Sequence, residues 1–434
     1  MDGPFWGHEE ERKSVSTAPQ TTLPSRANDA AYRERARRVI PNGMYGHLNT
    51  ARLGDDYPQF FARGEGARVW DVDGREFIDL MCTFGPILLG HAHPEVDAAA
   101  VATAARGDVL NGPGPEMVEL AERLVDRVAH ADWVMFAKNG TDATTLAVLA
   151  ARAQTGHRKV LVARGSYHGI AAWSAPPQAA GMTPEDHANT VSFDYNELAS
   201  VEAAVAEAGA DDIAAIVCTP HRHDVFRDQE PVDPEFARGV RAICDRAGAA
   251  LIIDDVRCGL RIDPRGSWES VGVRPDMSAW SKSLANGYAL AALVGAEPFR
   301  EAAGRITATG SFWLAGAPIA AALTTLRIYD ELDGVELLRA SGTRLQEGLR
   351  SQADAHGLQV SVTGPPAMPL LLFADDPEFE RTRAWARACA RNGVYLHPVH
   401  NWFLGTAHDE ATIDAALERT DEAMREIREA FGAD

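Results

Sequence analysis

The chain has 434 residues, a length that predicts one large domain and a smaller one. Apolar residues make up 46% of it, which is enough for an extensive core, and no apolar run approaches the roughly 20 residues needed to span a bilayer. The formal net charge of −20 argues against a nucleic-acid partner, since phosphate binding needs basic surface.

The N-terminal part is interpreted from its polar composition and its turn signals. Residues 1–27 are polar and are expected to form a mobile arm. A short helix is expected over 29–39, and the Asp-Gly turn inside 69–78 predicts a β-hairpin. Two more helices are expected, over 94–107 and 116–128.

Between residues 130 and 290, strand-like and helical segments alternate. The strand-like runs have no polar alternation, which is typical of a mainly parallel sheet buried on both faces. They lie at 133–137, 160–163, 213–218 and 250–255, with helices at 141–155 and 234–249. From about Gly316 a long helical stretch leads to a smaller α+β unit, which a helix over 410–430 closes.

We therefore expect an α/β protein in four parts. They are a mobile arm (1–27), an N-terminal segment that packs with the small domain (28–75), a large domain (76–325) and a small C-terminal domain (326–434). The five cysteines are scattered without a CxxC pair, which favours reduced thiols in a cytoplasmic protein over a disulfide or zinc framework.

Lysine is scarce in this chain, with four residues at 13, 138, 159 and 282 among 42 lysines and arginines. Lys282 closes the apolar run 276–282, just before a turn that contains Gly287. An amine at the end of a buried strand is partly desolvated, so it loses its proton more easily and can attack a carbonyl.

The segment from Lys138 to Ala143 follows an expected strand and begins a helix. Gly140 allows a tight turn, and the free backbone N–H groups of the helix start, with the Thr141 hydroxyl, can bind an anion. The helix dipole adds only about 0.3–1 kcal/mol, so the directed hydrogen bonds matter more. A plain capping turn is the structural alternative.

Two further side chains are expected at the same edge of the sheet, where open α/β sheets bind ligands. Asp254 closes a buried strand and needs a partner, either a ligand cation such as a protonated ring nitrogen or a structural arginine such as Arg257 or Arg261. Tyr167 follows another strand and can present a flat face to a planar ligand, or pack in the core.

An anion pocket, an aromatic face, a buried acid and a desolvated lysine along one sheet meet the needs of pyridoxal phosphate (PLP). The phosphate would lie at the helix start, the ring on Tyr167, the ring nitrogen at Asp254 and the aldehyde at Lys282. A nicotinamide nucleotide does not fit, because the chain has no strand–GxGxxG–helix unit and prolines interrupt its glycine-rich segment 111–115.

With these motifs the chain resembles the class III aminotransferases of the fold-type I PLP enzymes, and within them the glutamate-1-semialdehyde aminomutase branch. Matching segments extend from about residue 40 to 425, and include 70–74, 85–91, 139–143, 167–169, 254–261, 275–276 and 281–282. The resemblance implies a large domain with a mainly parallel central sheet and a smaller α+β C-terminal domain.

The resemblance also implies roles for individual residues. Lys282 would form a Schiff base with PLP and move protons, Asp254 would keep the pyridine nitrogen protonated, and Tyr167 would stack on the ring. Further contacts to the cofactor would come from Asn139, Gly140, Thr141, His168 and Val256. Ser311, after Gly310, matches a family threonine that reaches the phosphate of the neighbouring subunit, so a homodimer with shared active sites is implied.

The departures from that branch concern the substrate. The branch's carboxylate-binding arginine falls at or near Asn49, and its gating glutamate falls near His400. Loss of an arginine clamp removes a charge-assisted contact worth about 1.5–3 kcal/mol, so glutamate semialdehyde is not the expected substrate. The candidate substrate contacts are His47, Asn49, His221, Arg222, Trp313 and His400; a surface or core role is the alternative for each histidine.

We therefore expect an aminotransferase that moves an amino group from an amino-acid donor, with glutamate as one candidate, to an oxo substrate. An aminomutase or racemase that acts within a single substrate is the alternative, which the missing arginine weakens. A non-catalytic cofactor-binding regulator would lack Lys282 or Asp254, and both are present. No metal, nucleic-acid or membrane partner is expected.

Overall fold

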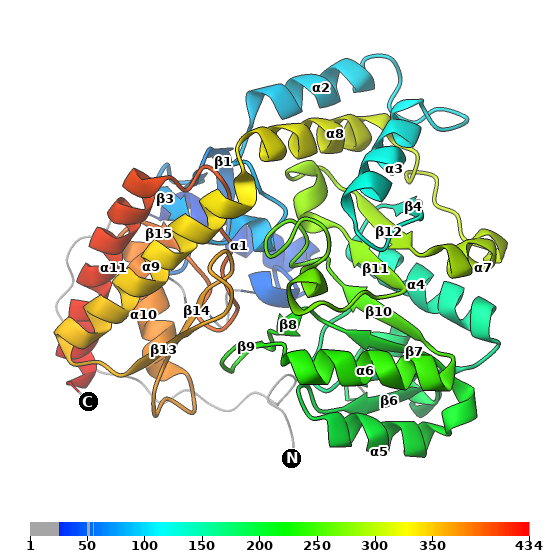
Figure 1. The fold of residues 1–434 in the computed structure, drawn as a ribbon. Helices are drawn as coiled ribbons and strands as arrows, with labels where there is room; N and C mark the ends of the chain where they lie inside the picture. Colours follow the sequence, from blue (N-terminus) through cyan, green and yellow to red (C-terminus); the bar gives the residue numbers. More distant parts are fainter. Residues whose placement is uncertain (1–25, 50–52, 55, 177, 434) are drawn as a thin grey trace.

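The computed structural model describes residues 26–49, 53–54, 56–176 and 178–433 (Figure 1). Nearly all of the arm expected over 1–27 lies outside these residues. The described chain begins with helix α1 (Ala27–Val39), as expected. None of the described helices combines the length and apolarity needed to cross a bilayer.

A seven-stranded sheet in the order β4-β12-β11-β10-β7-β5-β6 forms the centre of the larger unit. The ladders β11/β10, β10/β7, β7/β5 and β5/β6 are parallel, whereas β12 runs antiparallel to both of its neighbours. The mainly parallel sheet is therefore confirmed, with one reversed strand. The strands are β4 (Trp133–Ala137), β5 (Lys159–Ala163), β6 (Thr190–Phe193), β7 (Ile213–Cys218), β10 (Ala250–Asp254), β11 (Met277–Trp280) and β12 (Ala291–Gly295).

Side chains alternate between two apolar layers on this sheet, because successive residues of a strand point to opposite faces. Val160 and Val162 of β5 pack with α4 (Gly140–Thr155), whereas Leu161 and Ala163 pack with α5 (Leu198–Ala208) and α6 (Pro234–Ala247). The sheet is thus covered on both faces, which explains the continuous apolar runs in its strands (Figure 1).

Helices α2 (Pro94–Ala104) and α3 (Glu116–Arg127) pack against α8 (Gly316–Glu331) beside this sheet. The short helix α7 (Arg300–Arg305) packs on α4. Helix α8 leads into α9 (Gly334–His356), which begins the smaller unit (Figure 1).

The smaller unit combines the two ends of the described chain. Strand β15 (Val394–Tyr395) runs parallel to β3 (Glu76–Asp79), which pairs with β2 (Arg68–Asp71), and β2 pairs with β1 (Phe61–Glu65). The antiparallel pair β2/β3 confirms the predicted hairpin. The other elements are β13 (Val360–Thr363), β14 (Leu370–Phe373), α10 (Glu380–Arg391) and α11 (Glu410–Phe431). The domain boundaries stay a prediction, although β3 pairs with this unit and not with the central sheet.

Candidate active site

Lys282 lies at the carboxyl end of β11, at the start of the short 3-10 helix η8 (Lys282–Ala285). Its Nζ donates a hydrogen bond of 2.7 Å to the Phe84 carbonyl oxygen. Burial, together with the positive charges of Arg257 and Arg261, lowers the pKa of Lys282 from 10.5 to about 7. Near neutral pH, this amine is thus available in both its neutral and its charged form.

An unusual loop presents the Phe84 carbonyl to Lys282. Cys82, Thr83 and Phe84 all have positive φ, a region that non-glycine residues rarely adopt. Asp79 Oδ1 accepts hydrogen bonds from the backbone N–H groups of Met81 and Cys82 at 2.8 and 3.1 Å, and so holds the loop. A Cβ on the following residue, Gly85, would lie 3.2 Å from Cδ of Lys282, so the close approach requires glycine there.

Asp254 ends β10 and is buried, and its partner is a histidine. His168 Nδ1 lies 2.7 Å from Asp254 Oδ2, and the Val256 backbone N–H donates to Asp254 Oδ1 at 3.1 Å. The ring of Trp173 stacks on His168 with centroids 6.0 Å apart, which fixes the imidazole plane. Among the described residues, neither of the two arginines considered from the sequence forms an ion pair with Asp254, although the charge of Asp254 opposes the lowering of the Arg257 pKa by burial.

The start of α4 combines a cap with a glycine turn. The side chain of Asn139 accepts from the Asp142 N–H in a capping box, so this side chain stabilises the helix. A Cβ on Gly140 would lie 2.7 Å from Cγ1 of Val256, and Thr141 Oγ1 accepts from the Ile170 N–H at 3.3 Å. The N–H groups of Asp142 and Ala143 donate to Asn139, whereas those of Gly140 and Thr141 have no hydrogen-bond partner among the described residues and are available to an anion.

Tyr167 and Ser311 both lie at the surface around this helix start. Tyr167 is 55% exposed in the loop after β5, and its pKa is raised mainly by burial of the rest of its ring. Ser311 is exposed between α7 and α8, next to Phe312, whose ring lies 5.5 Å from Lys138 Nζ.

Two of the candidate substrate residues are engaged with other protein groups. His221 is buried, with Nε2 2.8 Å from Gln229 Oε1 and Nδ1 3.5 Å from Cys258 Sγ. Burial lowers the pKa of His221 to about 4. The Arg222 guanidinium pairs with Asp224 at 3.0 Å and with Glu230 at 3.1 Å, so its charge is already neutralised.

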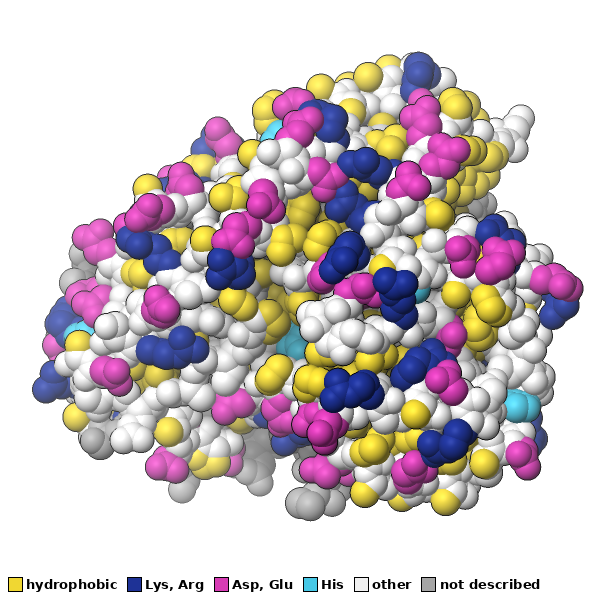
Figure 2. All heavy atoms as spheres, in the orientation of Figure 1, with side chains coloured by type: hydrophobic (Ala, Val, Ile, Leu, Met, Phe, Trp, Pro, Cys, Tyr) yellow, Lys and Arg dark blue, Asp and Glu magenta, His cyan; other side chains and the backbone are white. Residues whose placement is uncertain are grey.

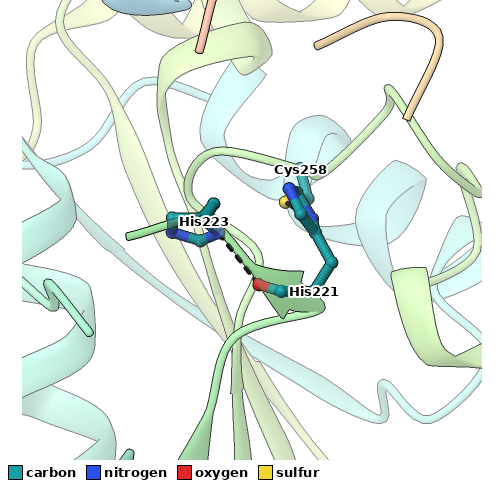
Figure 3. A group of neighbouring side chains, drawn as sticks. All are labelled: His221, His223 and Cys258. Carbon is teal, nitrogen blue, oxygen red and sulfur yellow. Dashed lines mark hydrogen bonds between the residues drawn. The ribbon is translucent and has the colours of Figure 1, made fainter. Parts of the chain in front are cut away.

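His221, His223 and Cys258 form a compact buried cluster (Figure 3). Their potential ligand atoms lie within 4.8 Å of one another, a spacing that a metal ion could bridge. His223 Nδ1, however, lies 3.0 Å from the His221 carbonyl oxygen, and both ring nitrogens of His221 have protein partners. Protein hydrogen bonds thus already engage these nitrogens.

The remaining candidates lie in different environments. His400 is buried against Phe84, with ring centroids 5.2 Å apart, and so belongs to the wall beside the lysine. Trp313 is partly buried and covers Gly310, where a Cβ would lie 2.4 Å from the indole nitrogen. Asn49 is partly exposed at the end of the short helix that contains His47, whose side chain lies outside the described part.

The site also contains Phe84, Asn401 and Phe403, which were not expected there from the sequence, and Arg257 was expected only as a partner of Asp254. Phe403 lies beneath the lysine, with Nζ of Lys282 5.7 Å from its ring centroid. Arg257 Nη1 donates to Asn401 Oδ1 at 2.8 Å. Of these residues, only Arg257 could have been placed in the site from the sequence, because it lies three positions after the acid that ends β10.

The residues of this edge of the sheet fit PLP. The glycine turn at Gly140 leaves a cradle that a Cβ would fill, and His168 Nε2 is buried without a hydrogen-bond partner. A lysine amine of lowered pKa and a buried carboxylate lie at the ends of the adjacent strands β11 and β10. An anion, a ring cation and an aldehyde are the three chemical groups that these features accommodate.

Comparison with known proteins points in the same direction. A family model described as Aminotransferase class-III matches residues 50–430. Curated relatives include an aminopentol aminotransferase of Sphingopyxis macrogoltabida, 48% identical, covering 92% of this chain and 94% of the relative. They also include a glutamate-1-semialdehyde 2,1-aminomutase of Bordetella avium, 34% identical, covering 90% and 97%. Among solved structures, the PLP internal aldimine form of the Sphingopyxis sp. MTA144 FumI protein has a TM-score of 0.91 at 47% identity, covering 93% and 97%.

Proposed function

The chain belongs to the class III aminotransferases and is a PLP-dependent enzyme, and from this premise we propose its substrates and the roles of its residues. The enzyme would act on two substrate pairs, each an amine and its oxo form. The first pair is an amino acid and its oxo acid, and the second is a hydroxylated amine and its oxo form. The 48% identity to an aminopentol aminotransferase supports the second pair, because that name denotes an amine with several hydroxyl groups. By the resemblance to the aminomutase branch, its charged substrate-site residues fall at or near Asn49 and near His400, and this difference supports a substrate other than glutamate semialdehyde.

The observation that carries the catalytic assignment is the Lys282 amine, held 2.7 Å from the Phe84 carbonyl on the strand next to Asp254. Bound PLP supplies an aldehyde that exchanges amines and a ring that withdraws electrons from the substrate carbon. With a pKa of about 7, Lys282 can accept and return the proton of that carbon near neutral pH. Asp254, oriented by His168, would accept a hydrogen bond from the ring nitrogen and keep that nitrogen protonated, and the start of α4 would bind the phosphate.

A two-step assay tests this function. Holoenzyme is first mixed with single amines, including hydroxylated amino alcohols, glutamate and alanine, and the change in cofactor absorbance reports the first half-reaction. Oxo acceptors are then added, and recovery of the original spectrum reports the second. Turnover of one compound to product without a separate donor or acceptor would establish an aminomutase instead.

We also propose that the enzyme is a homodimer with shared active sites. Exposed apolar residues surround the start of α4: Ile170 is 79% exposed, Phe312 62% and Tyr167 55%. A second subunit would cover them and bring Ser311 to the phosphate. Mixing Lys282→Ala chains with Ser311→Trp chains should then restore activity that neither variant has alone, because a mixed dimer contains one intact site.

We also propose that the protein is cytoplasmic. All five cysteines are buried and free, which supports a reducing compartment such as the cytoplasm. Acidic and basic side chains are interspersed over the face that carries α5, α6 and α9 (Figure 2).

A further inference from the structure

Three arginines of the described chain are buried: Arg33, Arg257 and Arg261. Arg33 forms an ion pair with Asp29 at 2.6 Å. Within the part of the chain that the structure describes, no carboxylate lies within 4.0 Å of Arg257 or Arg261. Burial of a guanidinium without a counter-charge is costly, so each of these two needs an explanation.

Arg261 has a structural explanation. Its Nη2 donates to the carbonyl oxygens of Gly85 and Ile87 at 2.8 and 3.1 Å, so it holds the loop that presents Phe84 to the lysine. It also lies 5.2 Å from the centroid of the Phe403 ring. Its Nε and Nη1 are buried without a hydrogen-bond partner, and its Nη2 is already engaged, so it offers no pair of solvent-accessible donors.

Arg257 differs because part of its guanidinium stays available. Nη1 donates to the His223 carbonyl oxygen at 3.3 Å and to Asn401 Oδ1 at 2.8 Å, both of which are uncharged. Nε and Nη2 form no hydrogen bond with any described residue, and neither belongs to the nitrogens that are sealed from solvent. Asp254 acts on Arg257 only through its charge and forms no ion pair with it, since its oxygens accept from His168 and the Val256 N–H.

A short chain of contacts connects Arg257 to the reactive amine. Asn401, which accepts from Arg257, follows His400 in the sequence. The His400 ring packs on Phe84, and the Phe84 carbonyl accepts from Lys282 Nζ. The free N–H groups of Arg257 therefore belong to the same wall of the site as the lysine.

We propose that Arg257 binds the carboxylate of the oxo-acid and amino-acid pair, an inference that rests on the proposed function and names the group that recognises one substrate. A guanidinium with two adjacent free donors matches the two oxygens of a carboxylate. Arg222, the arginine considered from the sequence, is already paired with Asp224 and Glu230. The hydroxylated amine needs no such contact, so one enzyme can discriminate its two partners by charge.

The test compares pyruvate with pyruvamide, its uncharged analogue, as acceptors for the amine-loaded holoenzyme. In Arg257→Gln, the ratio of KM for pyruvate to KM for pyruvamide should rise about 10- to 100-fold, the loss expected for one charge-assisted pair. Because Arg257 adds to burial in lowering the pKa of Lys282, loss of its charge changes kcat with both acceptors, and the test is therefore this ratio. In Arg257→Lys, the same ratio should lie between the values of the parent enzyme and of Arg257→Gln, because lysine keeps the charge and loses the paired donors. Titration calorimetry with propionate, a carboxylate that cannot react, should show weaker binding to the Gln variant than to the parent.

Three results would overturn the inference. Equal losses with pyruvate and pyruvamide, together with weaker PLP binding in dialysis, would mean that Arg257 holds the cofactor. A selective loss with pyruvate in Arg222→Gln, and none in Arg257→Gln, would assign the carboxylate to Arg222. If the parent enzyme transfers no amino group to any oxo acceptor, the proposed function itself fails and the inference fails with it.

Discussion

Replacement of Lys282 by methionine should stabilise the apoprotein while it abolishes activity. Folding lowers the pKa of this amine from 10.5 to about 7, chiefly through burial and then through Arg257 and Arg261. Below pH 7, the folded protein therefore carries a charge that its surroundings disfavour. Methionine has a similar shape and carries no charge, so the variant removes this cost and keeps the packing. It also loses the hydrogen bond to the Phe84 carbonyl, which costs about 1 kcal/mol at every pH.

The size of the effect follows from the shift. A difference of about 3.5 pKa units at 1.36 kcal/mol each gives an upper limit of roughly 5 kcal/mol, and partial exposure of the side chain reduces it to roughly 2–4 kcal/mol. Between pH 7 and 10.5 the unfolded chain holds this proton and the folded chain releases it, so the stability of the parent rises with pH across this window. The advantage of the variant should be full below pH 7, and above pH 10.5 the variant should be slightly less stable than the parent, because it lacks the hydrogen bond to Phe84.

The assay is urea unfolding of both apoproteins at pH 6.5, 8 and 9.5, so that the difference between the chains isolates position 282 from other titrating groups. Lys159→Met serves as the matched control, because the Lys159 amine bonds the Ala188 carbonyl at the surface. We expect no pH-dependent gain in the control. A Lys282→Met apoprotein that is no more stable than the parent at pH 6.5 would refute the desolvation of this amine.

Four further predictions concern other parts of the site. Asp254→Asn should keep the fold and lower kcat by about 100-fold or more at equal PLP content, because the ionised carboxylate is lost; a normal kcat would contradict its role. His168→Leu removes a hydrogen bond of 2.7 Å to a buried carboxylate, so kcat should fall about tenfold and the cofactor absorbance should shift. Gly140→Ala should raise the Kd for PLP, measured by dialysis, and Val256→Ala in the same chain should restore it, because the added methyl would lie 2.7 Å from Cγ1 of Val256. Since burial lowers the pKa of His221 to about 4, His221→Gln should leave the inflections of kcat/KM between pH 5 and 8 in place.

The sequence predicted the central sheet because its strands have a distinct composition. Every residue of β7 and β10 is buried, so each strand is an apolar run with no polar alternation. The strands β6 and β12 were not expected from the sequence. The reversal of β12 leaves no mark in its composition, since an antiparallel strand buried on both faces has the same composition as a parallel one. The pairing of β15 with β3 joins residues more than three hundred positions apart, and no local pattern encodes it.

The site was predictable where its residues end strands and not where loops bring them together. Lys282 and Asp254 end adjacent strands, so topology alone brings them near each other. The Phe84 carbonyl reaches Lys282 because three consecutive residues adopt positive φ. None of the three is a glycine, so the sequence does not indicate this conformation. Asn139 acts as a helix cap, the alternative considered for that turn, and the role of Ser311 depends on a second subunit.

The covalent attachment of PLP to the chain tests the central claim most directly. Borohydride reduction of the holoenzyme, followed by proteolysis and mass spectrometry, identifies the lysine that carries the cofactor among the four in the sequence. We predict a single labelled peptide that contains Lys282. A label on Lys138 or Lys159, or an unlabelled chain from an enzyme that remains active, would contradict the account.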